Sequence, residues 1–139
     1  MISQKAKYAF RALTLLAAAR AEGRALTIAE IAERRRIPRK FLEQILLELR
    51  RQGVLESWRG KNGGYAFLRP PDTVTFGEIL RIVDGTIAPL PCVSKIAYRR
   101  CEDCQGESDC EVRRVFAQVA DATRSVLDRT TIADATASS

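Results

Sequence analysis

Apolar residues return every three or four positions in several segments of the chain, which is the period of one face of an α-helix. Residues 3–21 form the first such segment, and Gly23 follows as its stop signal. Two more segments cover about residues 28–34 and 38–52. The inward-facing stripe of the third segment is predicted to consist of Phe41, Leu42, Ile45, Leu46 and Leu49. The pattern therefore predicts a long helix, a short helix and a second long helix.

Two of the predicted helices begin at a capping-box pattern. In such a box a Thr hydroxyl and a Glu carboxylate three residues later bond backbone amides that would otherwise lack partners. Thr27 and Glu30 have this spacing, and so do Thr75 and Glu78. The second box precedes an apolar run that Gly85 closes. We therefore expect a fourth helix that ends at this glycine.

A β-hairpin is predicted between the third and fourth helices. Two short β-type runs, residues 54–58 and 65–68, flank a turn-forming insert of Arg, Gly, Lys and Asn at 59–64. Helix, short helix, helix and basic hairpin in this order describe a winged helix-turn-helix. In that fold the second helix of the motif enters the major groove of DNA, and the hairpin, or wing, contacts the backbone or the minor groove.

The remainder of the chain divides into a loop, a helix and a tail. The loop shows no sustained periodicity, so we expect it to be ordered only if something ligates it. The final helix has an apolar seam suited to a partner helix, with Ser108 and Glu111 in register as its cap, and the tail is predicted to be disordered. The expected organisation is mainly α: a winged-helix DNA-binding domain with a two-stranded β wing (1–85), a cysteine-rich loop (86–109), a long dimerisation helix (110–132) and a disordered tail (133–139).

Polar side chains near the start of the third helix are the candidates for reading DNA bases. Arg can pair with guanine, Gln with adenine, and Glu can accept a hydrogen bond from the cytosine amino group. The candidates are Arg39, Lys40, Glu43 and Gln44. At the hairpin tip, Arg59 and Lys61 lie among glycines that permit close approach to phosphates. The alternative for each of these residues is an ordinary solvated surface position.

The charge distribution agrees with a nucleic-acid partner. The formal net charge is +6, with 15 Lys and Arg against 6 Asp and Glu in residues 1–70 and 8 against 11 in residues 71–139. A basic first half suits a polyanion such as double-stranded DNA, although a solvated surface rich in arginine would have the same composition. No apolar run approaches the ~20 residues that span a bilayer, and no signal peptide is evident. We therefore expect a cytoplasmic protein without membrane contact.

All four cysteines fall within 19 residues, at Cys92, Cys101, Cys104 and Cys110, and the chain has no histidine. A cluster of this kind in a reducing compartment indicates metal or redox chemistry, and the polar residues around it argue against thiols that merely pack in a core. Composition alone leaves a four-cysteine structural zinc site and a Cys101–Cys104 dithiol switch open. A thiol oxidoreductase would also use Cys101 and Cys104, but the βαβ context usual for that motif is missing, so we expect no enzyme.

Several segments in order resemble the IscR/NsrR/RirA-type winged-helix regulators of the Rrf-two superfamily, and the likeness covers nearly the whole chain. The most diagnostic segment is Arg59-Gly60-Lys61-Asn62-Gly63-Gly64-Tyr65. Further segments are Lys7-Tyr8-Ala9, Thr27-Ile28-Ala29-Glu30-Ile31-Ala32, Phe41-Leu42-Glu43-Gln44-Ile45-Leu46, Arg69-Pro70 and Ile82-Val83-Asp84-Gly85. The resemblance implies a homodimeric transcriptional regulator that binds a palindromic operator through Glu43, Gln44 and Arg59.

The same resemblance implies an iron–sulfur cluster, of the 4Fe–4S or 2Fe–2S type, held by three cysteines of the loop with a variable fourth ligand. Cys104 and Cys110 match the closing pair of the family's pattern, and Cys92 matches the opening position. The fourth cysteine, Cys101, departs from that pattern, so either all four bind or three bind with an outside ligand such as a carboxylate of the other subunit. Zinc, a thiol redox state or a small metabolite sensed beside the dimerisation helix remain the alternatives.

Overall fold

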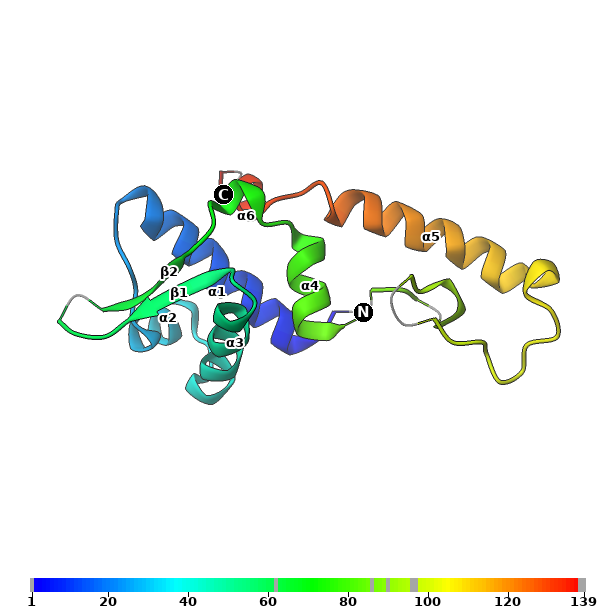
Figure 1. The fold of residues 1–139 in the computed structure, drawn as a ribbon, viewed down its shortest axis with the longest axis horizontal. Coiled ribbons are helices and arrows are strands. Elements are labelled where there is room, and N and C mark those ends of the chain that lie inside the picture. Colours follow the sequence, from blue (N-terminus) through cyan, green and yellow to red (C-terminus); the bar gives the residue numbers. More distant parts are fainter. Residues whose placement is uncertain (1, 62, 86, 90, 96–97, 138–139) are drawn as a thin grey trace.

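The computed structural model describes residues 2–61, 63–85, 87–89, 91–95 and 98–137 and shows a mainly α-helical chain with one antiparallel hairpin (Figure 1). The expected winged helix-turn-helix is confirmed. Asn62 of the predicted wing, residues 86, 90 and 96–97 of the predicted loop and residues 138–139 of the predicted tail lie outside the described residues. The elements are α1 (Gln4–Ala21), α2 (Ile28–Arg35), α3 (Arg39–Arg51), β1 (Leu55–Trp58), β2 (Gly64–Phe67), η1 (Pro71–Thr73), α4 (Phe76–Asp84), η2 (Pro91–Val93), η3 (Glu107–Asp109), α5 (Glu111–Leu127) and α6 (Ile132–Ala137).

Helix α1 is the centre of the domain because its small and aliphatic residues let other elements approach it closely. It contacts α2, α3, α4, α6 and β2. Ser3 caps its start, where the Ser3 hydroxyl accepts a hydrogen bond from the Ala6 amide at 3.0 Å. The buried residues of α1 recur at helical spacing and form the side of the helix that faces the rest of the domain: Ala6, Ala9, Ala12, Leu13, Leu15, Leu16, Ala17 and Ala19.

The helix-turn-helix motif is formed by α2 and α3. The predicted capping box at the start of α2 is confirmed, with the Thr27 hydroxyl accepting from the Glu30 amide at 3.1 Å and the Glu30 carboxylate accepting from the Thr27 amide at 3.4 Å. After α2 the chain turns at Arg36, Ile37 enters the core, and Pro38 precedes α3.

One residue of the stripe predicted for α3 does not face inwards. Leu42, Ile45, Leu46 and Leu49 are fully buried, whereas Phe41 is 49 % exposed. Successive residues of a helix are about 100° apart around its axis. At this spacing Phe41 falls outside the arc that the four buried residues cover, so it lies beside the buried stripe. The Phe41 ring instead lies against Tyr8 of α1, with 6.0 Å between the ring centroids.

The wing pairs β1 with β2 in an antiparallel register, with Leu55 opposite Phe67 and Trp58 opposite Gly64. Leu26, before α2, adds an isolated bridge to Tyr65 through two backbone hydrogen bonds of 3.0 and 2.7 Å. Gly64 has φ 145°, and a Cβ at this position would lie 2.6 Å from the Leu26 carbonyl oxygen. The close approach of the wing to the segment before α2 therefore requires glycine here.

The tail predicted to be disordered instead contains α6, which packs against α1 and η1. Ile132 is fully buried, and its amide donates to the Val74 carbonyl at 2.9 Å. Thr131 and Asp134 form a reciprocal capping box, with both hydrogen bonds at 3.0 Å. This Thr-Ile-Ala-Asp pattern repeats the Thr-Ile-Ala-Glu pattern at α2, so the sequence does carry a signal for this helix.

The predicted dimerisation helix corresponds to α5, which ends at Leu127 and not near residue 132. It projects away from the winged-helix domain beside the loop that contains the cysteines, at the end of the molecule opposite the hairpin (Figure 1). The chain then returns to the domain, where the Phe76 amide donates to the Thr130 carbonyl at 2.9 Å. Within the part of the chain described, no helix is long and apolar enough to cross a membrane.

Candidate functional site

The four candidates for base readout lie together at the amino end of α3. Arg39, Lys40, Glu43 and Gln44 are all exposed, and we call them the reading face. Residues four apart are neighbours on a helix surface, so Arg39 lies beside Glu43 and Lys40 beside Gln44. The Arg39 Nε atom is 3.8 Å from the Glu43 Oε1 atom. Both side chains of this contact remain exposed to solvent.

The two basic candidates of the wing are also exposed. Arg59 and Lys61 lie at the tip of the hairpin, and no carboxylate among the described residues forms an ion pair with either. The tip is tight, because a Cβ on Gly63 would lie 2.5 Å from the Trp58 carbonyl oxygen. Two unpaired cations on a narrow turn can approach phosphates closely.

The four cysteines line one cavity of about 590 Å³, between the segment that contains Cys92, Cys101 and Cys104 and the start of α5. We call this cavity the cysteine pocket. None of the four is in a disulfide. The Cys101 thiol donates a hydrogen bond to Cys92, with 3.9 Å between their sulfur atoms. Four of the eight other lining residues are acidic, and Arg113 is the one basic residue among them.

Local structure holds the cysteines at the pocket in two ways. Cys92, on η2, is 5 % exposed and forms a small second core with Val93 and Ala120 of α5. Cys110 is the N-cap residue of α5, and its sulfur accepts a hydrogen bond from the Arg113 amide at 3.4 Å. The sequence suggested Ser108 for this cap, but Ser108 belongs to η3, so the cap falls two residues later.

The surroundings of Cys101 stabilise the protonated form of its thiol. A hydrogen bond to Cys92 raises the pKa of the Cys101 thiol, and desolvation and the charge of Asp103 add to the effect. Arg113 places a positive charge at the pocket. Its Nη2 atom lies 3.4 Å from the Cys92 carbonyl, and its Nε atom lies 3.8 Å from the Glu107 carboxylate. Because thiolates bind metals and thiols do not, a metal centre would have to displace the protons of this pocket.

One sulfur–sulfur distance of the pocket can be compared with the geometry of a metal centre. Four thiolates around one zinc ion at 2.3 Å lie about 3.8 Å apart, and the Cys92–Cys101 pair has nearly this separation. No three Cys, Asp or Glu side chains within the described ranges converge closely enough to hold one ion. The thiol donors suit soft metals, and a cavity of about 590 Å³ accommodates a polyatomic group more readily than a single ion.

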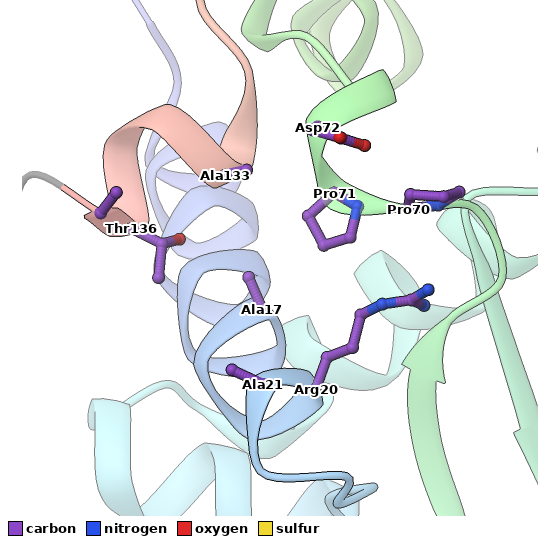
Figure 2. Close-up of a pocket in the computed structure, with 9 residues that line it drawn as sticks. Ala17, Arg20, Ala21, Pro70, Pro71, Asp72, Ala133 and Thr136 are labelled. Carbon is purple, nitrogen blue, oxygen red and sulfur yellow. The ribbon is translucent and has the colours of Figure 1, made fainter.

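A second cavity, of about 480 Å³, lies beside the carboxyl end of α1, next to η1 and α6. Figure 2 shows Ala17 and Ala21 of α1 and Ala133 of α6 on one side of it and Pro70 and Pro71 on the other. The Arg20 guanidinium donates to the Phe67 carbonyl at 3.1 Å. This cavity is the space that small side chains leave between packed helices, and its lining contains no thiol or acid–base pair that would suggest chemistry.

Comparison with known proteins shows that this chain is similar to transcriptional regulators. The sequence profile of the Rrf2 family, described as an iron-dependent transcriptional regulator, matches residues 2–138. A protein of Rhodobacter capsulatus named as an rrf2-like HTH-type transcriptional regulator is 53 % identical over 121 residues, which are 86 % of this chain and 81 % of the relative.

Solved structures give the same result for the fold. The structure of CymR, the global cysteine regulator of B. subtilis, superposes with a TM-score of 0.82 at 29 % identity, covering 100 % of this chain and 98 % of CymR. The IscR structure of T. potens has a TM-score of 0.72 at 28 % identity, covering 96 % and 84 % of the two chains. These relatives are named as regulators and not as enzymes.

Proposed function

The chain belongs to the Rrf2 family of transcriptional regulators, and from this premise we propose that it is a homodimer whose operator binding is controlled by an iron–sulfur cluster in the cysteine pocket. One observation carries the proposal: four thiols line a single cavity at the amino end of the exposed helix α5. The proposed units are the winged-helix domain, the loop that contains Cys92, Cys101 and Cys104, and α5 as the dimerisation helix.

The reading face and the wing have different roles in this proposal. Glu43 and Gln44 contact base edges in the major groove of a palindromic operator, with Arg39 and Lys40 beside them. Arg59 and Lys61 contact the phosphate backbone or the minor groove from the wing. All six side chains are exposed. This supports contact with DNA, because none of them has to leave a buried environment to reach it.

A second copy of the chain would cover the apolar side of α5. Ala120 is the one residue of this helix that is buried in the monomer. Five large apolar residues of α5 are between 40 % and 57 % exposed: Val112, Val115, Phe116, Val119 and Val126. An apolar stripe of this length is costly in water, and a symmetric helix pair would remove it from solvent.

Cys92, Cys104 and Cys110 would hold the cluster, and Cys101 is the candidate for the fourth ligand. When bound, an iron–sulfur cluster supplies one-electron redox chemistry and reacts with small oxidants. The protein's own part is to present thiolates from two elements at once, because Cys110 begins α5 whereas Cys92 belongs to η2. Arg113 offsets negative charge at the pocket.

The coupling between pocket and DNA would run through α5. This helix of 17 residues is about 25 Å long, with Cys110 at its free end and Asp128 at the end that is held to Arg81 of α4. A change in the pocket would therefore alter the angle between α5 and the winged-helix domain. In a dimer that angle sets the separation of the two reading faces, which must match half-sites about one helical turn apart, ~34 Å.

Two measurements test the proposal. Protein purified without oxygen is expected to absorb visible light and to contain iron and sulfide. Glu43→Ala or Gln44→Ala is expected to cost on the order of 1–3 kcal/mol at the operator and to relax base preference, whereas Lys61→Ala weakens binding to all sequences alike. Equal and sequence-independent losses in all three variants would contradict the assignment of α3 to the groove.

A cluster-free redox regulator is the second candidate, and the 3.9 Å Cys92–Cys101 separation favours it. The sequence predicts Cys101 and Cys104 as the dithiol, and Cys92 is a further candidate partner for Cys101. Colourless anaerobic protein that loses two mass units on mild oxidation, and contains neither iron nor zinc, would support this alternative. One zinc per chain without sulfide would instead indicate a structural zinc site.

A further inference from the structure

Five cations surround the turn between α2 and α3: Arg34, Arg35, Arg36, Arg39 and Lys40. We propose that Arg36, at the centre of this turn, contacts the phosphate backbone of DNA. The inference rests on the proposed function and assigns to the turn a backbone contact that is separate from the bases read by α3. It follows from the conformation of Arg36, from the surroundings of its side chain and from its place beside the reading face.

The fold demands a left-handed residue at this position. Arg36 has φ 54° and ψ 51°, and its amide donates to the Ala32 carbonyl. The Ile37 amide donates to the same carbonyl at 3.0 Å, and the Ile37 side chain is 3 % exposed. These two hydrogen bonds end α2, and the chain enters the core at the next residue, Ile37. Glycine adopts the conformation at least cost, and asparagine follows it.

Among the described residues, Arg36 is the one non-glycine residue with positive φ. Nothing inside the chain compensates for this conformation: the side chain is exposed, and no hydrogen bond or ion pair to its guanidinium is found in the described part of the chain. Its neighbours Arg34 and Arg35 carry the same charge. Backbone and electrostatics both oppose an arginine here, which is the pattern expected where a side chain serves a partner outside the protein.

The charge and the location identify the partner. Among these five cations, Arg39 alone forms an ion pair with a carboxylate of the described residues. Such a cluster fits a polyanion better than a single small anion. Arg36 lies three residues before the start of α3, next to the amino end that carries the reading face. When the amino end of such a helix lies in the major groove, the residue just before it meets the strand that borders the groove.

The test compares Arg36→Asn with Arg36→Lys in the full-length protein, with Arg129→Gln as a control for removal of an exposed arginine far from the turn. Arg36→Asn is expected to raise Tm by roughly 2–4 °C, because the strained residue is replaced by one suited to the turn. It is also expected to weaken binding to operator and to random duplex alike, by about eightfold per protomer at 0.1 M salt.

Salt dependence provides the decisive readout. The slope of log K against log salt concentration should become shallower by about one per protomer in Arg36→Asn and stay at the wild-type value in Arg36→Lys and Arg129→Gln. Wild-type DNA binding combined with an unchanged slope in Arg36→Asn would overturn the inference about Arg36 alone. A wild-type protein that binds no duplex at low salt would overturn the proposed function as well.

Discussion

The Arg81 guanidinium binds the Asp128 carboxylate through two parallel hydrogen bonds, Nη1 to Oδ1 at 2.7 Å and Nη2 to Oδ2 at 3.0 Å. The pair joins α4 to the residue that caps the carboxyl end of α5. The bonds lower the pKa of the Asp128 carboxyl group and raise the pKa of Arg81. Because α5 projects from the domain, this pair holds its carboxyl end to α4.

Gly77 makes room for the Arg81–Asp128 pair, and Gly77→Ala is expected to break this pair. Alanine normally favours a helix over glycine by about 1 kcal/mol. Here, however, a Cβ would overlap the Asp128 carboxylate and lie 2.9 Å from the Arg81 Nη1 atom. Both side chains can move aside, so losing a pair worth on the order of 0.5–1 kcal/mol should cancel most of the helix gain and leave Tm close to the wild-type value.

A double variant is the control for this prediction. With Asp128→Ala in the background the obstructing carboxylate is gone, so Gly77→Ala should raise Tm. If Gly77→Ala changed Tm equally in both backgrounds, contact with Asp128 would not be what limits alanine at this position.

Stability should depend on the protonation of Asp128 at low pH. The pKa of this carboxyl is lowered in the folded state, so its contribution is present above the unfolded value, about 4, and is lost as the pH falls through the folded pKa. Both partners are partly exposed, so the contribution is on the order of 0.5–1 kcal/mol. Asp128→Asn should therefore lower Tm at pH 6–7, and its difference from wild type should shrink below pH 4.

Local patterns in the sequence were enough to predict most of the winged-helix domain. The Thr27–Glu30 box, the hairpin and the buried stripe of α3 from Leu42 onwards depend on residues close in sequence, and the structure has all three. The two expectations that the structure corrects, an inward-facing Phe41 and a disordered tail, also concern local patterns. Phe41 lies beside the buried stripe, and the Thr131–Asp134 box marks the start of α6.

The contacts of the candidate site could not be predicted in the same way. The contact of Cys101 with Cys92, nine residues earlier, is a tertiary arrangement that the Cys-x-x-Cys spacing of Cys101 and Cys104 does not indicate. The pairing of Arg81 with Asp128, 47 residues apart, depends on the return of the chain after α5. Neither relationship has a periodic signal in the sequence.

A charge in the apolar side of α5 should disrupt the proposed dimer. Val119 is 40 % exposed in the monomer, and Val119→Glu would place an unpaired carboxylate in the helix pair, which costs several kcal/mol. Sedimentation should then show monomer or aggregate, with weaker operator binding. Gln118→Glu, an exposed neighbour that gains the same charge, should remain dimeric. A dimeric Val119→Glu protein would mean that α5 is not the interface.

Serine substitutions test the cluster one ligand at a time. Cys92→Ser, Cys104→Ser and Cys110→Ser should each abolish the visible absorbance of anaerobic protein and reduce iron and sulfide to background, because a hydroxyl oxygen is a poor substitute for thiolate on iron. Operator affinity or operator choice should change by on the order of 5- to 100-fold. Far-UV circular dichroism should hardly change, since the helices of the winged domain do not depend on the pocket.

Cys101→Ser separates the possible ligand sets, and it is expected only to weaken the cluster. The Cys101 sulfur lies 3.9 Å from that of Cys92, so it is near enough to bind without being one of the three cysteines that match the family's pattern. If Cys101→Ser removed the absorbance as completely as Cys92→Ser does, four thiolates would form the ligand set. If it left the spectrum unchanged, the fourth ligand would come from elsewhere. Colourless wild-type protein with one zinc per chain and no sulfide would defeat the cluster, because zinc has no visible absorbance, and would leave the DNA-binding half of the proposal standing.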